Sequence, residues 1–247
     1  RPADIWIYFS VYDDTDNGTV IDFAKNRLDK PLFEVGKELE KWLGTTAKLP
    51  LLYTSKQKEK GSKSDSARIV RLFNSCQTST EHPYLNNRGI NKKTLSSSRF
   101  RNRIFQDHFR NVVFPHLKKG VACGLELVNE QMHLFVSGSE KTLWRSNRLQ
   151  CDDVLMIAET PIDAISYEIL HNPGSAFYVS TSGGYSNKQA DILKRLLSEC
   201  HWIKKVNLIV DNDKGGDQMA KRLEMHIKQT SFLGLVERHS PKKRGCD

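Results

Sequence analysis

The sequence predicts an α/β fold, with an α+β N-terminal part followed by a Rossmann-like domain that has a mostly parallel sheet. From residue 154 onward, short apolar runs alternate with helical patterns, the order expected when helical crossovers join parallel strands. These runs are apolar almost throughout, as expected for strands covered by helices on both faces. Between residues 112 and 136, apolar runs are separated only by short polar breaks, which predicts a small antiparallel sheet.

Composition limits the class of protein. The 247 residues suffice for one large or two small domains, and the formal net charge of +9 favours a polyanionic partner. The five cysteines are far apart and form no CxxC pair, so neither a zinc site nor a disulfide framework is predicted. No apolar run approaches the roughly 20 residues that span a bilayer, and no signal pattern is present, so we expect a cytoplasmic protein. Because the chain begins at Arg1 rather than Met, we expect a fragment of a longer protein.

The first part of the chain predicts a small domain of its own. Residues 5–10 predict a strand, a polar turn and short helix follow up to Leu28, and residues 33–43 have apolar positions near helical spacing. Residues 54–66 are rich in Lys and Ser and almost lack apolar side chains, which is typical of a linker. The predicted division is a remnant of an N-terminal domain at 1–53, a linker at 54–66, a basic subdomain at 67–150 and a last domain at 151–247.

The basic subdomain combines apolar elements with clustered cations. Between Arg88 and Arg103 six basic residues occur and no acidic one, and a second basic cluster lies near Lys141. These clusters favour a surface that faces nucleic acid, although a solvated basic face is an equal alternative for any single residue. Phe100 and Phe105 lie among the arginines, where core packing is favoured over base stacking. The predicted elements are a helix at 67–76 and strands at 112–115, 121–128 and 133–136.

The last domain alternates strands with capped helices. Thr160 is a good N-cap, and Pro161 occupies the first helical position, where proline is tolerated. Ser186 and Gln189 have the spacing of a capping box for a second helix. The predicted strands are at 154–158, 176–180, 206–210 and 232–236, and a third helix is expected after Gly215 and Gly216.

Carboxylates follow two of these strands directly. Glu159 and Asp211 each come immediately after a strand, at the edge of a parallel sheet where ligands bind. Asp213 can point the same way as Asp211 in an extended stretch, and Asp217 lies at the start of the next helix. Without a cation these acids would repel one another, and Mg²⁺ prefers a few carboxylates together with water and phosphate oxygens. The pattern predicts a divalent metal site.

Simpler roles compete with metal binding at some of these positions. Asp163 can cap Thr160, and Asp217 can be an ordinary acid in the first turn of a helix. The segment from Asp211 to Asp217 is also compatible with a plain Asp/Gly turn. Glycines let the backbone approach a phosphate closely, and they occur beside the acids at Gly183, Gly184, Gly215 and Gly216.

These acids resemble a known family pattern. Glu159 with Asp163, followed by Asp211–Asp213 and Asp217, is similar to the toprim domain shared by DnaG-type primases, topoisomerases and some nucleases. Upstream, HPYLNNRGI at 82–90 resembles the opening of the primase catalytic core, and the apolar stretch at 111–127 resembles its strands. Residues 141–147 resemble the segment before its toprim part, and residues 15–28 resemble the end of its zinc-binding domain. The chain as a whole is most similar to the primase-like toprim proteins of plasmids and mobile elements.

The resemblance implies a metal-dependent nucleotidyltransferase that makes short primers on single-stranded DNA for plasmid or mobile-element replication or transfer. It implies that Asp211 and Asp213 hold Mg²⁺ or Mn²⁺, that Asp217 is a supplementary ligand, and that Glu159 is a ligand or general acid/base. Implied partners are single-stranded DNA, nucleoside triphosphates and a helicase or mobilisation protein. The residues that would contact template or triphosphate are Arg88, Arg99, Arg101, Arg103, Lys141, Arg145 and Asn147.

Other functions compete with the primase. A toprim nuclease would use the same acids with water as the nucleophile, although the segment at 82–90 argues for the primase. A DNA-binding module of a mobilisation protein would bind DNA without needing Glu159 or Asp211. The sequence has no His-x-His pair of a relaxase, no GxxxxGK[ST] of a P-loop NTPase, and no ligands of the family's zinc ribbon.

Overall fold

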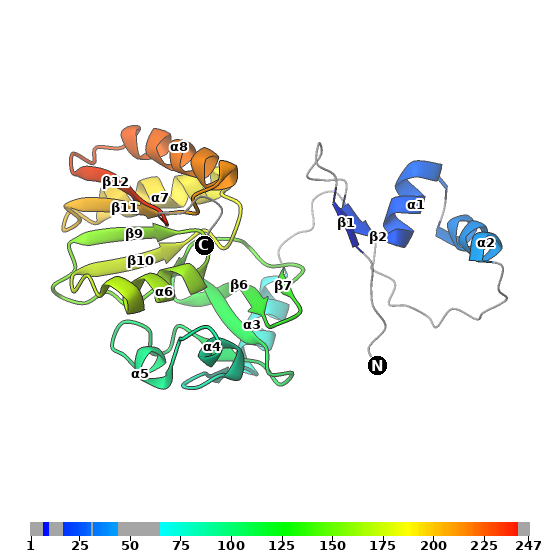
Figure 1. Cartoon of the computed structure of the whole chain (residues 1–247), viewed down its shortest axis with the longest axis horizontal. Helices are drawn as coiled ribbons and strands as arrows, with labels where there is room; N and C mark the ends of the chain where they lie inside the picture. Colours follow the sequence, from blue (N-terminus) through cyan, green and yellow to red (C-terminus); the bar gives the residue numbers. More distant parts are fainter. Residues whose placement is uncertain (1–6, 10–16, 31, 44–64, 242–247) are drawn as a thin grey trace. The chain divides into compact units, whose positions relative to one another are not determined.

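The chain separates into two compact units, Arg1–Glu59 and Lys60–Asp247 (Figure 1). The structure is a computed structural model that describes residues 7–9, 17–30, 32–43 and 65–241. The predicted linker at 54–66 lies outside the described residues except for Asp65 and Ser66. Both the linker and the division of the chain at residue 150 therefore remain predictions.

In the first unit, a short antiparallel ribbon precedes two helices. Thr19 caps the first helix because its side chain accepts a hydrogen bond from the Asp22 N–H, while the Asp22 carboxylate accepts one from the Thr19 N–H at 2.8 Å. Within the described residues, the predicted strand and both predicted helices are confirmed. The elements are β1 (Ile7–Phe9), β2 (Asn17–Thr19), α1 (Val20–Leu28) and α2 (Leu32–Leu43).

An antiparallel sheet forms the first part of the second unit. Its strand order is β3-β4-β5-β6-β7, and the central hairpin turns at Lys119 and Gly120, both of which have positive φ. Ile69 of the preceding helix packs with Val113 and Leu125 on one face of this sheet. The elements are α3 (Ser66–Asn74), β3 (Gln77–Thr78), α4 (Pro83–Asn86), α5 (Lys92–Leu95), β4 (Phe105–Gln106), β5 (Val112–Lys118), β6 (Val121–Val128) and β7 (His133–Phe135).

A second sheet has the order β12-β11-β9-β10-β8, in which all neighbours are parallel except the edge strand β8. This arrangement confirms the predicted α/β fold with a mostly parallel sheet. The capping boxes at Thr160 and Ser186 are both formed, so two helices begin where the sequence predicts. The elements are β8 (Trp144–Arg145), β9 (Val154–Ala158), α6 (Pro161–His171), β10 (Ala176–Ser180), α7 (Asn187–Glu199), β11 (Lys205–Ile209), α8 (Lys214–Lys228) and β12 (Leu235–His239).

Apolar side chains on the two faces of this sheet enter different cores. Leu155 and Ile157 of β9 pack with α7 and α8, which lie on one side of the sheet (Figure 1). Met156 and Ala158 point the other way and pack with α6 and with residues of the preceding subdomain, among them Phe100. Alternation along a strand thus explains why its sequence is apolar at every position. Phe100 is fully buried, which confirms its predicted core role.

Some predicted boundaries differ from the structure. The strand predicted at 206–210 begins one residue earlier, and the one predicted at 232–236 is β12, which starts at Leu235. Gly234, the residue before β12, makes a close backbone approach, since a Cβ there would lie 2.1 Å from the Lys204 carbonyl oxygen. The two-residue strands β3, β4 and β8 are too short to show a hydrophobic period.

Candidate functional site

Parallel pairing brings the ends of three strands to one edge of the sheet. Ala158 of β9 is in register with Ser180 of β10 and with Ile209 of β11. Glu159 follows Ala158 directly, and Asp211 lies two residues beyond Ile209. Both acids therefore lie at the carboxyl edge of the sheet, the position at which open α/β sheets bind ligands.

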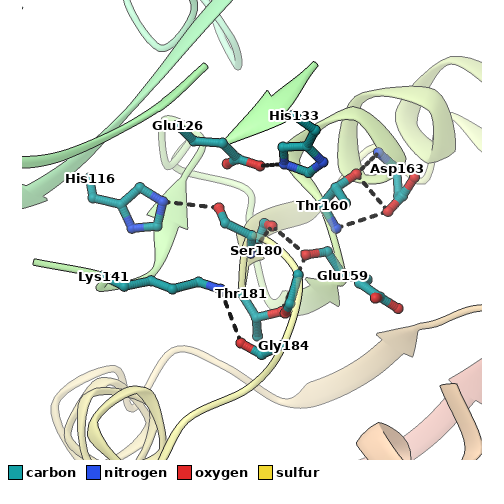
Figure 2. Close-up of polar contacts among 12 residues, drawn as sticks. His116, Glu126, His133, Lys141, Glu159, Thr160, Asp163, Ser180, Thr181 and Gly184 are labelled. Atoms are coloured by element: carbon teal, nitrogen blue, oxygen red, sulfur yellow. Dashed lines mark hydrogen bonds and ion pairs between the residues drawn. The ribbon is translucent and has the colours of Figure 1, made fainter. Parts of the chain in front are cut away.

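The main chain at Glu159 is held by the loop that follows β10 (Figure 2). Its carbonyl oxygen accepts hydrogen bonds from the Gly183 N–H at 2.9 Å and the Ser180 hydroxyl at 3.0 Å, with Thr181 Oγ1 at 3.2 Å. Gly183 has φ +82°, which glycine adopts without strain. Because the backbone is fixed in this way, the Glu159 carboxylate changes position only by side-chain rotation.

Lys141 brings a cation to the same loop. Its Nζ donates a hydrogen bond to the Gly184 carbonyl oxygen at 3.1 Å (Figure 2). Burial lowers the pKa of Lys141, while the negative charges of Glu126 and Glu159 oppose that shift. The structure thus places the predicted residues Lys141, Gly183 and Gly184 beside Glu159.

Asp163 serves as the capping partner of Thr160 (Figure 2). Its Oδ2 accepts hydrogen bonds from the Thr160 N–H at 2.8 Å and the Thr160 hydroxyl at 2.7 Å. The Asp163 N–H in turn reaches Thr160 Oγ1 at 3.2 Å. The capping role predicted for Asp163 is therefore formed, and its charge still acts on Glu159.

Asp211 and Asp213 flank a tight entry into α8. Asp213 is the N-cap, and its Oδ1 accepts a hydrogen bond from the Gly216 N–H at 2.7 Å. A Cβ on Gly216 would lie 2.0 Å from the Asp211 carbonyl oxygen, so this position requires glycine. The helix begins at Lys214, and the prediction that Gly215 and Gly216 precede it is wrong. An N-capping aspartate accounts for the earlier start.

Asp217 is held in an ion pair that the sequence did not indicate. Arg238 of β12 donates one hydrogen bond to Asp217 Oδ1 at 2.5 Å and another to the Asp211 carbonyl oxygen at 2.7 Å. This arginine ties the acid-containing turn to the edge strand. Arg238 therefore neutralises part of the Asp217 charge that a metal ion would use.

The carboxylates at this edge repel one another. Burial raises the pKa of Glu159, and Lys141 partly opposes the shift. The negative charges that raise the pKa further are, in order of size, those of Asp211, Asp163 and Asp213. A divalent cation would relieve this repulsion, and carboxylate oxygens suit Mg²⁺, so Glu159, Asp211 and Asp213 fit such an ion chemically. Among the described residues, no three His, Cys, Asp or Glu side chains already converge as a ligand set.

His116 connects the antiparallel sheet to the loop around Glu159. Its Nδ1 accepts the Thr142 N–H at 3.1 Å, so the ring proton is on Nε2, which lies 2.9 Å from Ser182 Oγ. Burial lowers the pKa of His116 to about 4, which keeps the imidazole neutral near pH 7. Ser182 has φ +56°, so this bond supports a strained residue of the loop.

A cleft of about 390 Å³ opens in front of the acids. Glu159, Asp163 and Asp211 line one side of it, and residues of β6 and β7 line the other. Arg88 is exposed at the cleft, with its guanidinium 5.0 Å from the centre of the Tyr84 ring. Of the predicted nucleic-acid residues, Arg88 and Lys141 are therefore close to the acids.

The other predicted nucleic-acid residues do not line this cleft. Asn147 supports the loop of residues 98–103, since its Nδ2 donates to the Ser98 and Arg101 carbonyl oxygens at 3.0 and 2.9 Å. Its Oδ1 accepts a hydrogen bond from Arg103 at 2.7 Å. Burial is the main cause that lowers the pKa of both Arg103 and Arg145, and Arg101 is exposed.

Arg99 is held inside the fold by two carboxylates. Its side chain is 4% exposed and donates two hydrogen bonds to the Asp152 carboxylate, at 3.0 and 2.9 Å. Its Nε lies 3.4 Å from Glu168. The Arg99 side chain is thus held in a buried ion pair and does not line the cleft, and its contact with nucleic acid stays a prediction. The sequence of the basic run does not indicate this ion pair, because the partners of Arg99 are 53 and 69 residues away, at positions 152 and 168.

Two family matches cover adjacent parts of the chain. Residues 156–244 match the family described as Toprim-like, and residues 83–150 match a family described as a protein of unknown function (DUF3991). The first match confirms the predicted toprim resemblance over the segment that holds the acids. No curated protein matches the chain significantly.

The chain is also similar to solved primase structures. It aligns with a DNA primase domain from Pseudomonas aeruginosa at 18% identity and a TM-score of 0.40, covering 58% of this chain and 46% of that one. The zinc-binding and RNA polymerase domains of the Aquifex aeolicus primase align at 20% identity and a TM-score of 0.46, with 94% and 66% covered. The RNA polymerase domain of the Mycobacterium tuberculosis primase DnaG aligns at 14% identity and a TM-score of 0.38, with 74% and 71% covered. The chain thus spans less than two thirds of the first two solved chains.

Proposed function

We propose that this chain, whose residues 156–244 form a Toprim-like domain, is a metal-dependent nucleotidyltransferase that synthesises short primers on single-stranded DNA. The observation that carries the proposal is the set of carboxylates Glu159, Asp211 and Asp213 at the carboxyl edge of a parallel sheet. The primase-type segment at 82–90 supports it, because Tyr84 and Arg88 from that segment line the cleft in front of the acids.

In the proposed reaction, Asp211 and Asp213 would hold Mg²⁺ or Mn²⁺, with Glu159 completing the site. The bound ion would stabilise charge on the attacked phosphate and on the leaving pyrophosphate. Glu159, whose raised pKa reflects burial and neighbouring acids, would alternatively accept the proton of the attacking 3′-hydroxyl. Arg88 and Lys141 would counter the charge of template and triphosphate, and the setting would be plasmid or mobile-element replication or transfer in the cytoplasm.

Primer synthesis tests the proposal directly. The protein would be incubated with single-stranded DNA, labelled nucleoside triphosphates and Mg²⁺ or Mn²⁺, beside a Glu159→Gln variant. Short labelled products that disappear in the variant are the expected result. Shortened DNA without synthesis would show a nuclease instead. DNA binding that is unaffected by Glu159→Gln, with neither product formed, would show a binding module.

A further inference from the structure

A histidine and a glutamate form a pair on the wall of the cleft opposite the toprim acids. Glu126 of β6 is only 1% exposed, and its Oε1 lies 2.5 Å from His133 Nε2 on the neighbouring strand β7 (Figure 2). Both residues line the same cleft as Glu159 and Asp211. Both residues lie in the segment 83–150, which matches the family of unknown function, and not in the Toprim-like match at 156–244.

The surroundings of His133 favour its charged form. The hydrogen bond to Glu126 raises the pKa of His133, and the charges of Glu126 and Asp163 raise it further. Burial and the positive charge of Lys141 act in the opposite direction. These groups come from β6, α6 and the segment that follows β7. When it is protonated, the His133 ring is a cation in a cleft whose other wall is acidic.

The geometry leaves one ring nitrogen available to a ligand. Nε2 of His133 is directed at Glu126, while 47% of the side chain remains exposed. In the protonated ring, Nδ1–H can therefore donate a hydrogen bond into the cleft. The Glu126 carboxylate is buried, and its contact with Nε2 holds the His133 ring in one orientation.

We propose that His133, positioned by Glu126, binds the phosphate chain of a nucleoside triphosphate in this cleft. The proposal rests on the proposed function, and it assigns the wall opposite the acids to the triphosphate. The carboxylates at the sheet edge would hold the cation that accompanies the nucleotide. A charged hydrogen-bond donor across from them would hold phosphate oxygens that the metal leaves uncovered.

The test measures binding rather than turnover. Calorimetric titration with ATP and Mg²⁺, and separately with inorganic tripolyphosphate and Mg²⁺, would compare wild type with His133→Gln and Glu126→Gln. His201→Gln is the matched control, because His201 is exposed and does not line the cleft. Thermal melting of each variant would establish that it is folded.

We expect His133→Gln to weaken ATP and tripolyphosphate binding about tenfold or more at pH 7, the usual effect of losing a charged hydrogen bond. Wild-type affinity should fall as pH rises through the raised pKa of His133, above the ordinary histidine value, because the imidazolium loses its proton there, and His133→Gln should lack that component. Glu126→Gln should move the loss to lower pH. His201→Gln should bind like wild type.

A folded His133→Gln protein that binds both probes like wild type at every pH would overturn the proposal and leave the pair as a structural link between strands. Failure of the role proposed for His133 can be distinguished from failure of the proposed primase function. Wild type that makes primers while His133→Gln binds normally refutes only the role of His133. Wild type that makes no primers but binds triphosphate through His133 refutes only the primase.

Discussion

Replacing Arg99 with Met should destabilise the protein rather than weaken a contact with DNA. The Arg99 guanidinium donates two hydrogen bonds to Asp152, whose side chain is completely buried, and lies near Glu168. Methionine preserves most of the side-chain volume but leaves the Asp152 carboxylate without its counter-charge. Removing one partner of a buried ion pair costs about 3–5 kcal/mol of unfolding free energy.

The loss of unfolding free energy in Arg99→Met can be measured as a lower melting temperature. For a unit of this size, each 1 kcal/mol lowers the melting temperature by about 2–4 °C, so Arg99→Met should melt roughly 6–20 °C below wild type. Arg101→Met is the matched control, because Arg101 lies in the same basic run but is exposed. Its melting temperature should stay close to that of wild type.

Salt dependence separates the two roles. At a temperature where every variant is folded, Arg99→Met should keep the wild-type dependence of DNA affinity on salt, since a residue that touches no phosphate releases no counterion. A variant that melts like wild type but loses about one unit of the salt slope would refute the structural role of Arg99.

Three further predictions concern the acid edge and its support. Gly216→Ala should abolish the Mg²⁺ binding measured by calorimetry and lower the unfolding free energy by about 1–3 kcal/mol, because its Cβ would lie 2.0 Å from the Asp211 carbonyl oxygen. In Gly215→Ala the new Cβ would meet only the Asp213 side chain, at 3.3 Å, so this variant should lose less of both. Equal losses in the two variants would contradict the steric argument. The raised pKa of Glu159 means that the folded state binds the proton more tightly, so stability without metal should fall as pH rises above the ordinary glutamate pKa. Glu159→Gln should remove that fall and melt higher than wild type at neutral pH in EDTA, and a lower melting temperature would show that the ionised carboxylate stabilises the fold. His116 has the opposite sign, since its pKa is lowered from 6.5 to about 4, so its contribution is present above pH 6.5 and is lost as pH falls toward 4. That loss is on the order of 3 kcal/mol, so the unfolding free energies of wild type and His116→Gln in urea should converge over this range. A difference that stays constant would show that the pKa of His116 is not lowered in the folded protein.

Local signals in the sequence were sufficient for most elements of the second unit. The boundaries of β9 and β10 follow from short apolar runs, and the helix starts at Thr160 and Ser186 follow from side-chain capping, which depends on neighbours three residues away. The edge that carries Glu159 and Asp211 follows from the rule that parallel strands end together. The parts that could be predicted are therefore those set by neighbouring residues and by strand direction.

Long-range partners account for what the sequence did not show. Arg238 lies on a strand that was predicted three residues too early, and nothing in its own neighbourhood indicates that it binds the turn at Asp211 and Asp217. His116 and His133 each occur alone in an apolar run, where a histidine has no distinguishing pattern. Their roles come from Ser182 and Glu126, which only the folded chain brings to them.

The short strand β8 joins the two matched segments of the chain into one folding unit. It lies in the segment that matches the family of unknown function, yet it forms the edge of the sheet that belongs to the Toprim-like segment. Trp144 from β8, with Phe100 and Phe114, shares one core with Met156 and Tyr178. A gene rearrangement that separated the two segments would expose that core on both products. We therefore expect gene recombination to keep the two segments together. We also expect that either segment expressed alone gives insoluble protein.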